Sequence, residues 1–347
     1  IIGGGFGGIE LAKRLRSKEV QVVMLDKHNY HTFQPLLYQV ATGGLEPDSI
    51  AYPLRKIFKN QRNFTFRVAE VLSIDPVQKL VHTSIGHTSY DFLVLATGSE
   101  TNFFGNKEME HYAMPMKTVP EALDLRSLIL QHFEAALLED SINEQEAHMN
   151  FVVVGGGPTG VEICGALAEL KNHVLPKDYP ELDLRKMQIN LLEGTQELLG
   201  AMSDNSSVKA AKFLKEMGVN LWLNARVLSY DGKTVQLDSG RLFESYNVIW
   251  TAGVRGKVIE GIDSSAVLRG NRYKVNEFSQ VEGHESIFAI GDVAAMISDE
   301  YPHGHPGVAP AAMQQGKHLA RNIIRLVNGA PMEPFDYFDK GSMATIV

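Results

Sequence analysis

The pattern of apolar positions along the chain repeats. A short apolar run, a glycine-rich turn, a helix-like stretch and a buried strand follow one another twice. The first set opens with Ile1–Ile2 before "GGGFGG" and ends with "VQVVMLD" at Asp26. The second opens with "FVVV" before "GGGPTG" and ends with "MQINLLE" at Glu193. Strands that alternate with helical patterns in this way predict an α/β fold with parallel sheets.

Both turns have the spacing G-x-G-x-x-G. The glycines are Gly3, Gly5 and Gly8 in the first turn and Gly155, Gly157 and Gly160 in the second. In this spacing the first glycine permits a tight turn, the second lets a pyrophosphate approach the backbone, and the third allows close packing of helix on strand. The phosphates then lie at the helix N-terminus. The sequence therefore predicts two dinucleotide-binding sites.

An acidic residue ends the strand after each turn. Asp26 lies 18 residues after Gly8 (26 − 8), close to the roughly 20 expected for an acid that binds a ribose hydroxyl. Glu193 lies 33 residues after Gly160 (193 − 160), because "HVLPKDYPELDLRK" inserts a loop. We predict that both acids bind ribose, and that Glu193 favours NADH over NADPH by repelling a 2′-phosphate. A merely solvated strand-end carboxylate is the alternative for Glu193.

Two further strands also repeat. "YDFLVLATGSE" (90–100) and "YNVIWTAGVRG" (246–256) each run into a turn of small residues. A third, "SIFAIGDVAA" (286–295), closes on Asp292 and precedes the helix-like "AAMQQGKHLARNII". An acid at the end of a strand is well placed to bind a polyol chain. The alternative for Asp292 is a helix cap.

Composition and charge narrow the class of protein. At 347 residues the chain has room for two domains of roughly 100–200 residues each. Its net charge is −8 and its Lys and Arg form no block, which argues against a nucleic-acid partner. Cys164 is the single cysteine, which excludes a disulfide framework and a redox-active cysteine pair. It also excludes a multi-cysteine metal site.

Other stretches bear on membranes, metals and the chain ends. No apolar run reaches the roughly 18 residues of a transmembrane helix. The amphipathic pattern at 125–140 predicts a helix that packs against the first nucleotide-binding domain rather than on a membrane. His303 and His305 are expected in a surface loop, and no metal site is predicted. Because so little precedes the first turn, we expect a piece of a longer protein that lacks its initiator methionine and a C-terminal segment.

The two nucleotide folds, the "ATG"-like strands and the late "GD" segment resemble the two-dinucleotide-binding flavoprotein superfamily. The resemblance covers essentially the whole chain. It implies two Rossmann-like domains, with NAD(P)H bound by a domain inserted into a discontinuous FAD domain. The expected boundaries are 1–115 and 265–330 for the FAD domain and 116–264, with its leading helix, for the NAD(P)H domain. Residues 331–347 would begin a C-terminal membrane-associating region.

The resemblance also implies cofactor contacts beyond the glycines and acids above. The expected FAD-binding residues are Phe6, Gly7, Lys27, Val71, Ala96, Thr97, Gly98, Gly291, Asp292 and Ala309, and the expected NADH-binding residues are Pro158, Thr159 and Gly253.

Within the superfamily, disulfide reductases and sulfide:quinone reductases use cysteines that this chain lacks. "DKHNYHTFQPLLYQVATGGLEP" (26–47) and "FDYFDKGSMATI" (335–346) resemble type II NADH:quinone oxidoreductases. That resemblance implies hydride transfer from NADH to FAD, then transfer of two electrons to a quinone, with Lys340 approaching the flavin. It implies a peripheral position on the cytoplasmic face of the cell membrane, held by the C-terminal segment. A homodimer stays open.

Two more residues are expected to act on the substrate. The resemblance implies that Glu162 handles protons, because the family's matching glutamate lies at the nicotinamide and quinone side. Glu10 occupies the same place in the first repeat, however, where a carboxylate simply favours the helix N-terminus. Gln314 is predicted to donate to a quinone carbonyl, with a hydrogen bond to backbone as the alternative. Pro310 stands where the family carries an earlier glutamine. Two other functions stay open: a soluble NAD(P)H-dependent ferredoxin or rubredoxin reductase, and a non-catalytic redox sensor that binds NADH and FAD.

Overall fold

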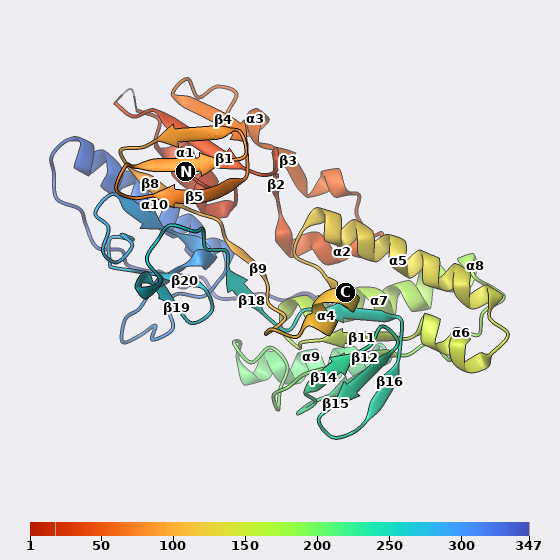
Figure 1. Cartoon of the computed structure of the whole chain (residues 1–347). Coiled ribbons are helices and arrows are strands. Elements are labelled where there is room, and N and C mark those ends of the chain that lie inside the picture. Colours follow the sequence, from red (N-terminus) through yellow and green to blue (C-terminus); the bar gives the residue numbers. More distant parts are fainter. Residues whose placement is uncertain (18, 347) are drawn as a thin grey trace. The chain divides into compact units, whose positions relative to one another are not determined.

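The computed structural model describes residues 1–17 and 19–346, which form two compact units (Figure 1). The first unit contains Ile1–Thr32, Ala51–Glu100 and Val254–Gly341. The second contains Phe33–Ile50, Thr101–Gly253 and Ser342–Val347. The main body of the second unit therefore lies, in sequence, between two segments of the first.

The first unit is built on a parallel sheet whose central strand is the start of the chain. Ile2 forms parallel bridges to Leu25 on one side and Leu95 on the other. The strand order is β4, β1, the chain start, β8 and β21. The bounds are Val22–Asp26 for β1, Phe64–Val68 for β4, Leu93–Leu95 for β8 and Ile287–Ala289 for β21. Gly3 and Asp26 thus lie at the carboxyl ends of adjacent strands, where ligands bind in open α/β sheets.

Two helices of the first unit, α1 (Phe6–Arg14) and α10 (Ala309–Val327), pack against each other and share a core with the sheet. Leu11 of α1, Met24 of β1 and Leu319 of α10 are all fully buried in this core. The inner strands β1 and β8, with β21, are mostly apolar on both faces, as expected of a parallel sheet covered by helices, whereas the edge strand β4 also carries Thr65 and Arg67.

Smaller elements complete the first unit. An antiparallel meander consists of β5 (Val71–Asp75), β6 (Leu80–Thr83) and β7 (Gly86–Ser89). Three strands form another sheet: β19 (Val267–Leu268), β20 (Arg272–Val275) and β22 (Ala294–Met296). The remaining pairs are β2 (Tyr30–Thr32) with β3 (Ala51–Pro53), followed by α3 (Leu54–Ile57), and β9 (Ser99–Thr101) with β18 (Val254–Gly256).

The second unit contains a five-stranded parallel sheet in the order β10, β17, β11, β12, β13. The bounds are Met114–Pro115 for β10, Phe151–Val154 for β11, Ile189–Leu192 for β12, Val219–Trp222 for β13 and Asn247–Trp250 for β17. A meander again follows in the chain, formed by β14 (Val227–Tyr230), β15 (Thr234–Leu237) and β16 (Leu242–Glu244). The repeat in the sequence is therefore also a repeat in the structure.

The helices of the second unit include three that pack on its sheet, α5 (Val119–Leu138), α7 (Pro158–Glu169) and α9 (Asp204–Glu216). The others are α2 (Leu37–Ala41), α4 (Lys107–Tyr112), α6 (Ile142–Met149) and α8 (Leu175–Asp178).

Helix α5 packs on elements from both expected domains. It begins with a capping box in which the Thr118 hydroxyl accepts the Glu121 N–H and the Glu121 carboxylate accepts the Thr118 N–H. Its buried face, which includes Ile129 and Phe133, packs on α2, α6, β10 and β17, all in the second unit. The expected packing against the first nucleotide-binding domain, given as 1–115 and 265–330, therefore holds for α2 and β10, whereas α6 and β17 lie within 116–264.

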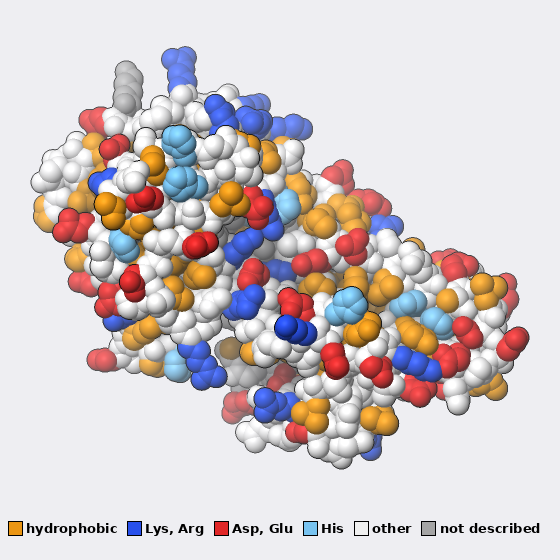
Figure 2. Space-filling model, viewed as in Figure 1, with side chains coloured by type: hydrophobic (Ala, Val, Ile, Leu, Met, Phe, Trp, Pro, Cys, Tyr) orange, Lys and Arg blue, Asp and Glu red, His pale blue; other side chains and the backbone are white. Residues whose placement is uncertain are grey.

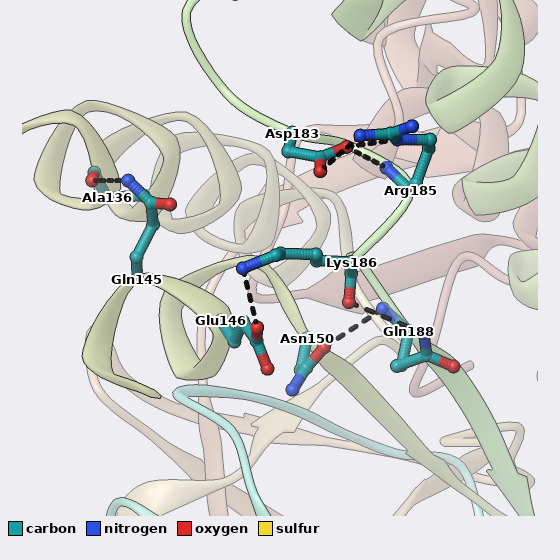
Figure 3. Close-up of polar contacts among 8 residues, drawn as sticks. All are labelled: Ala136, Gln145, Glu146, Asn150, Asp183, Arg185, Lys186 and Gln188. Carbon is teal, nitrogen blue, oxygen red and sulfur yellow. Dashed lines mark hydrogen bonds and ion pairs between the residues drawn. The ribbon is translucent and has the colours of Figure 1, made fainter. Parts of the chain in front are cut away.

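The inserted loop before β12 is anchored beside α6 (Figure 3). The Lys186 ammonium lies 3.3 Å from the Glu146 carboxylate, and the Gln188 N–H donates to Asn150 Oδ1 at 2.9 Å. Within the loop, Arg185 Nε donates to Asp183 at 2.7 Å. The insertion is thus absorbed outside the sheet, and β12 pairs with β11 over all four residues.

Candidate functional site

The first glycine turn leaves space where a dinucleotide would lie. Gly3 has φ +108°, and a Cβ there would lie 2.2 Å from the Ala96 carbonyl oxygen. A Cβ on Gly8 would lie 2.0 Å from the Gly3 carbonyl oxygen. A Cβ on Gly5, in contrast, would meet no atom within 4 Å. The outer glycines are therefore required by packing, whereas the central one borders open space, as a pyrophosphate needs.

The second turn repeats this geometry. Gly155 has φ +110°, and its Cβ would lie 2.6 Å from the Ala252 Cα. A Cβ on Gly160 would lie 1.8 Å from the Gly155 carbonyl oxygen, and one on Gly157 would meet nothing within 4 Å. The residues present thus fit a second dinucleotide, by the same test.

The two strand-end acids hold their turns in the same way. Asp26 Oδ2 accepts the Gly4 N–H at 2.6 Å, and Glu193 Oε2 accepts the Gly156 N–H at 2.6 Å. The other oxygen of each accepts the N–H two residues further on, at 2.8 Å for Asp26 and 2.7 Å for Glu193. Each carboxylate oxygen can accept two hydrogen bonds, so both acids retain capacity for ribose hydroxyls. The longer spacing before Glu193 does not displace it.

Asp292, the acidic residue near the end of the first unit, also makes a side-chain hydrogen bond. Asp292 accepts a hydrogen bond from the Ser99 hydroxyl at 2.6 Å, directly after the "ATG" turn. The N-cap of α10 is Val308, so Asp292 is not its cap. The neighbouring Gly291 N–H donates to Gln315 Oε1 at 2.7 Å. Sequence reasoning missed Ser99 and Gln315, although both lie within the quoted motifs.

The remaining predicted residues are divided between the units. Those in the first unit are Phe6, Gly7, Lys27, Val71, Ala96, Thr97, Gly98 and Ala309, and those in the second are Pro158, Thr159 and Gly253. Thr97 contributes a contact that the sequence did not reveal, because its hydroxyl donates to the Lys257 carbonyl at 2.5 Å. His31 was likewise missed. Its ring packs edge-on against Phe6 at 4.8 Å between ring centres.

The lone cysteine and the two loop histidines have structural surroundings. Cys164 is fully buried in α7, and burial raises the pKa of its thiol. This confirms that it is a small core residue. His303 is exposed as expected, but His305 is buried, 7% exposed, and its ring contacts those of Tyr301 and Tyr337. The expectation of a surface loop is therefore wrong for His305, because the nearby Tyr301 and the sequence-distant Tyr337 cover its ring.

Glu162 lies at the first turns of α7 beside a cavity of about 70 Å³. The cavity is lined by Gln34, Pro35, Leu37, Tyr38, Met116, Lys117, Thr159 and Glu162, all of the second unit. Burial raises the pKa of Glu162 to about 7, against a smaller lowering by the Thr345 N–H, which donates to Oε1 at 3.3 Å. Glu10, its counterpart in the first repeat, instead pairs with Arg14 at 2.8 Å. The two glutamates therefore differ in their surroundings.

Glu162→Gln is expected to melt at about the same temperature as the wild type at pH 5 and a few degrees higher at pH 8. The folded protein binds the Glu162 proton more tightly than the unfolded chain does, since the pKa rises from 4.5 to about 7. Its favourable contribution is therefore lost as pH rises through about 7, whereas glutamine does not ionise. Melting curves at both pH values test this, with Glu10→Gln as the matched control. If the melting temperatures of Glu162→Gln and the wild type differed by the same amount at pH 5 and pH 8, the expectation would be contradicted.

Gln314 makes hydrogen bonds to backbone, which was the alternative to its predicted contact with a quinone. Its side-chain Nε2 donates to the Phe338 carbonyl at 2.9 Å, and its Oε1 accepts the Phe338 N–H at 3.1 Å. Both polar ends of the amide thus pair with backbone of the first unit. Lys340 lies two residues beyond Phe338 and is exposed.

Among residues 1–17 and 19–346, no helix combines the length and apolar character needed to cross a bilayer. On the face drawn in Figure 2, hydrophobic side chains are scattered among charged ones. Surface hydrophobic residues distributed in this way are normal for folded proteins.

Two glycine turns, each with its strand-end acid, define a class of oxidoreductases that bind two dinucleotides. The model of the family described as pyridine nucleotide-disulphide oxidoreductase matches residues 1–316. A type II NADH:quinone oxidoreductase of Mycobacterium tuberculosis is 38% identical over 100% of this chain and 76% of the relative. One of Haemophilus influenzae is 32% identical over 100% of this chain and 84% of the relative. This chain therefore belongs to the pyridine nucleotide-disulphide oxidoreductases, and within them to the type II NADH:quinone oxidoreductases.

Solved structures confirm the α/β fold. NDH2 from Plasmodium falciparum, determined in complex with NADH, matches with a TM-score of 0.86 at 21% identity, covering 99% of this chain and 87% of that one. The sulfide:quinone oxidoreductase from Aquifex aeolicus matches with a TM-score of 0.77 at 22% identity, covering 95% and 77%. The resemblance inferred from the sequence is thus confirmed at the level of family and fold.

Proposed function

We propose that the protein oxidises NADH and reduces a membrane quinone, with FAD bound by the turn at Gly3–Gly8 and NADH by the turn at Gly155–Gly160. FAD, when bound, supplies the hydride acceptor and the two-electron donor of the reaction. The protein binds and orients both dinucleotides through the N–H groups of the turns and through Asp26 and Glu193. Glu162, with a pKa of about 7, can hold or release a proton near neutral pH.

The observation that carries this proposal is the duplicated contact between acid and turn. In each unit a strand-end carboxylate accepts the N–H of the residue before the central glycine at 2.6 Å. Two such sites suit a two-nucleotide enzyme, and membership of the type II family supports a quinone as acceptor. The single, buried Cys164 supplies no thiol pair for a disulfide substrate.

The finer organisation is proposed with it. The FAD domain comprises 1–115 and 265–330, the NADH domain 116–264, and residues 331–347 begin the membrane-associating region. Packing divides the chain differently, at 100/101 and 253/254, and assigns 33–50 and 342–347 to the second unit. Compact units reflect contacts, whereas these domains are defined by the cofactor they bind. We place the protein peripherally on the cytoplasmic face of the cell membrane, on the basis of the family resemblance.

The purified protein is expected to be yellow and to release FAD on denaturation. The first turn, Asp26 and Asp292 bind without a covalent bond, and the only cysteine is buried away from solvent. Visible absorbance before and after heat denaturation and filtration measures this. A protein that shows no flavin bands even after incubation with FAD would contradict the proposed cofactor. Flavin that stays with the pellet would contradict its non-covalent attachment.

A further inference from the structure

Residues 331–341, here called the strap, have no helix or strand of their own yet are held in place on α10. Asn322 Nδ2 donates to the Glu333 carbonyl at 2.9 Å, and Asn322 Oδ1 accepts the Glu333 N–H at 2.9 Å. Gln314 makes the same two-way contact with the backbone of Phe338, at 2.9 and 3.1 Å. A side-chain amide has an NH₂ group that donates and a carbonyl oxygen that accepts, so it can pair with a peptide group through one of each. Each of these two pairs of an amide with a peptide group is here called a rung, and the two together the ladder, because each takes the place of one pair of backbone hydrogen bonds between β-strands.

The two rungs give the strap a direction and a register. As the position on α10 falls from Asn322 to Gln314, the position on the strap rises from Glu333 to Phe338, so the strap runs antiparallel to the helix. Between the rungs, the buried ring of His318 contacts the Phe335 ring at 5.3 Å between centres. An extended chain that slips by one residue turns every side chain to its opposite face. Two rungs and one ring contact exclude such a slip.

The strap is also fixed at its start and in its middle. Arg325 Nε donates to the Pro331 carbonyl at 2.6 Å, and the Arg325 guanidinium lies 2.9 Å from the Glu333 carboxylate. The Phe335 N–H donates to the Glu277 carbonyl at 2.8 Å. The Phe338 rung lies two residues before Lys340, and the residues on either side of Lys340 contact each other, since Asp339 Oδ1 accepts the Gly341 N–H at 2.8 Å.

We propose that Gln314 and Asn322 are positioning residues, which set the register of the strap and thereby the place of Lys340. The inference rests on the proposed function and on the family resemblance, which implies that Lys340 approaches the flavin. It gives Gln314 a task besides quinone binding, because one N–H and one lone pair of its amide are engaged with the Phe338 backbone. Asn322 is a new candidate. It lies far from Lys340 in the sequence, and no motif indicated a role for it.

The test uses Gln314→Met, which keeps the length of the side chain and removes both hydrogen bonds. Asn322→Leu serves as the second variant, and Lys317→Met on the exposed side of α10 is the matched control. Gln314 is only partly buried, so its replacement leaves the core intact. Amide hydrogen exchange of the strap is measured in all variants, together with the rate at which a short-chain quinone reoxidises the reduced protein.

Both ladder variants are expected to speed exchange in the strap and to slow reoxidation by about tenfold, as loss of two hydrogen bonds would. The control should do neither. In a Lys340→Ala background, Gln314→Met should still speed exchange but should slow reoxidation no further. Unchanged exchange in the single variants would overturn the ladder. If Gln314→Met slowed reoxidation in the Lys340→Ala background as much as it does in the wild type, Gln314 would act on the quinone directly. Exchange needs no turnover, so it tests the ladder even if wild-type quinone reduction, and with it the proposed function, failed.

Discussion

Replacing Gly157 by alanine is expected to weaken NADH binding by about 5- to 150-fold while leaving FAD content and melting temperature unchanged. A Cβ at this position meets no protein atom within 4 Å, so the fold has room for it. The same space is where the pyrophosphate must approach the turn, and an added methyl group in a filled site costs about 1–3 kcal/mol. The dissociation constant for NADH, measured by fluorescence titration, gives the effect directly.

The matched control is Gly5→Ala, at the equivalent position of the first turn. Its Cβ also meets nothing within 4 Å, and it should weaken FAD binding while leaving NADH binding unchanged. Gly160→Ala should behave differently from both, because its Cβ would lie 1.8 Å from a backbone carbonyl and must distort the turn. If Gly5→Ala and Gly157→Ala affected the same cofactor, the assignment of one dinucleotide to each turn would be wrong.

Replacing Glu193 by alanine is expected to lower kcat/KM for NADH by at least tenfold and to narrow the preference over NADPH. The Glu193 carboxylate accepts two backbone N–H groups, at 2.6 and 2.7 Å, and hydrogen bonds to a charged group contribute about 1.5–3 kcal/mol each. Alanine removes both, together with the carboxylate that we propose binds the ribose and repels a 2′-phosphate. The following stretch "GTQELL" contains no arginine to bind that phosphate in its place.

Two further variants separate these contributions. Glu193→Gln keeps the size and one acceptor oxygen but removes the charge, so it should narrow the cofactor preference more than it lowers turnover with NADH. Asp26→Ala, the counterpart in the first unit, should reduce FAD content instead. Initial rates with NADH and NADPH over a range of concentrations give both kcat/KM values. A preference that stays the same in Glu193→Gln would rule out Glu193 as the selector.

The parts of the site that depend on local sequence were predictable. The glycine spacing, the helix after it and the strand-end acid all lie within one strand–turn–helix–strand unit, so periodicity and turn chemistry locate them. Glu193 was predicted in spite of its longer spacing, because the strand before it is apolar throughout. The longer spacing does not change the position of Glu193 at the strand end, because the inserted loop contacts Glu146 and Asn150 outside the sheet.

The parts that depend on tertiary contacts were not predictable. The burial of His305 requires Tyr301 and Tyr337 to fold over it, and the engagement of Gln314 requires Phe338 to lie beside α10. Neither leaves a trace in local periodicity. The amphipathic pattern of helix α5 is compatible with packing on any apolar surface. Only the pairing of β10 with β17 determines which sheet the helix covers.

The central claim, electron flow from NADH through bound FAD to a quinone, is tested most directly by stopped-flow absorbance of the purified protein. Mixing anaerobically with NADH should bleach the visible flavin bands, and a second mixing with a short-chain quinone should restore them within the turnover time. Restoration by ferredoxin or rubredoxin, but not by quinone, would identify a soluble electron-transfer reductase instead. Flavin bands that NADH does not bleach at any rate relevant to turnover would contradict the account altogether and leave a protein that only senses its nucleotides.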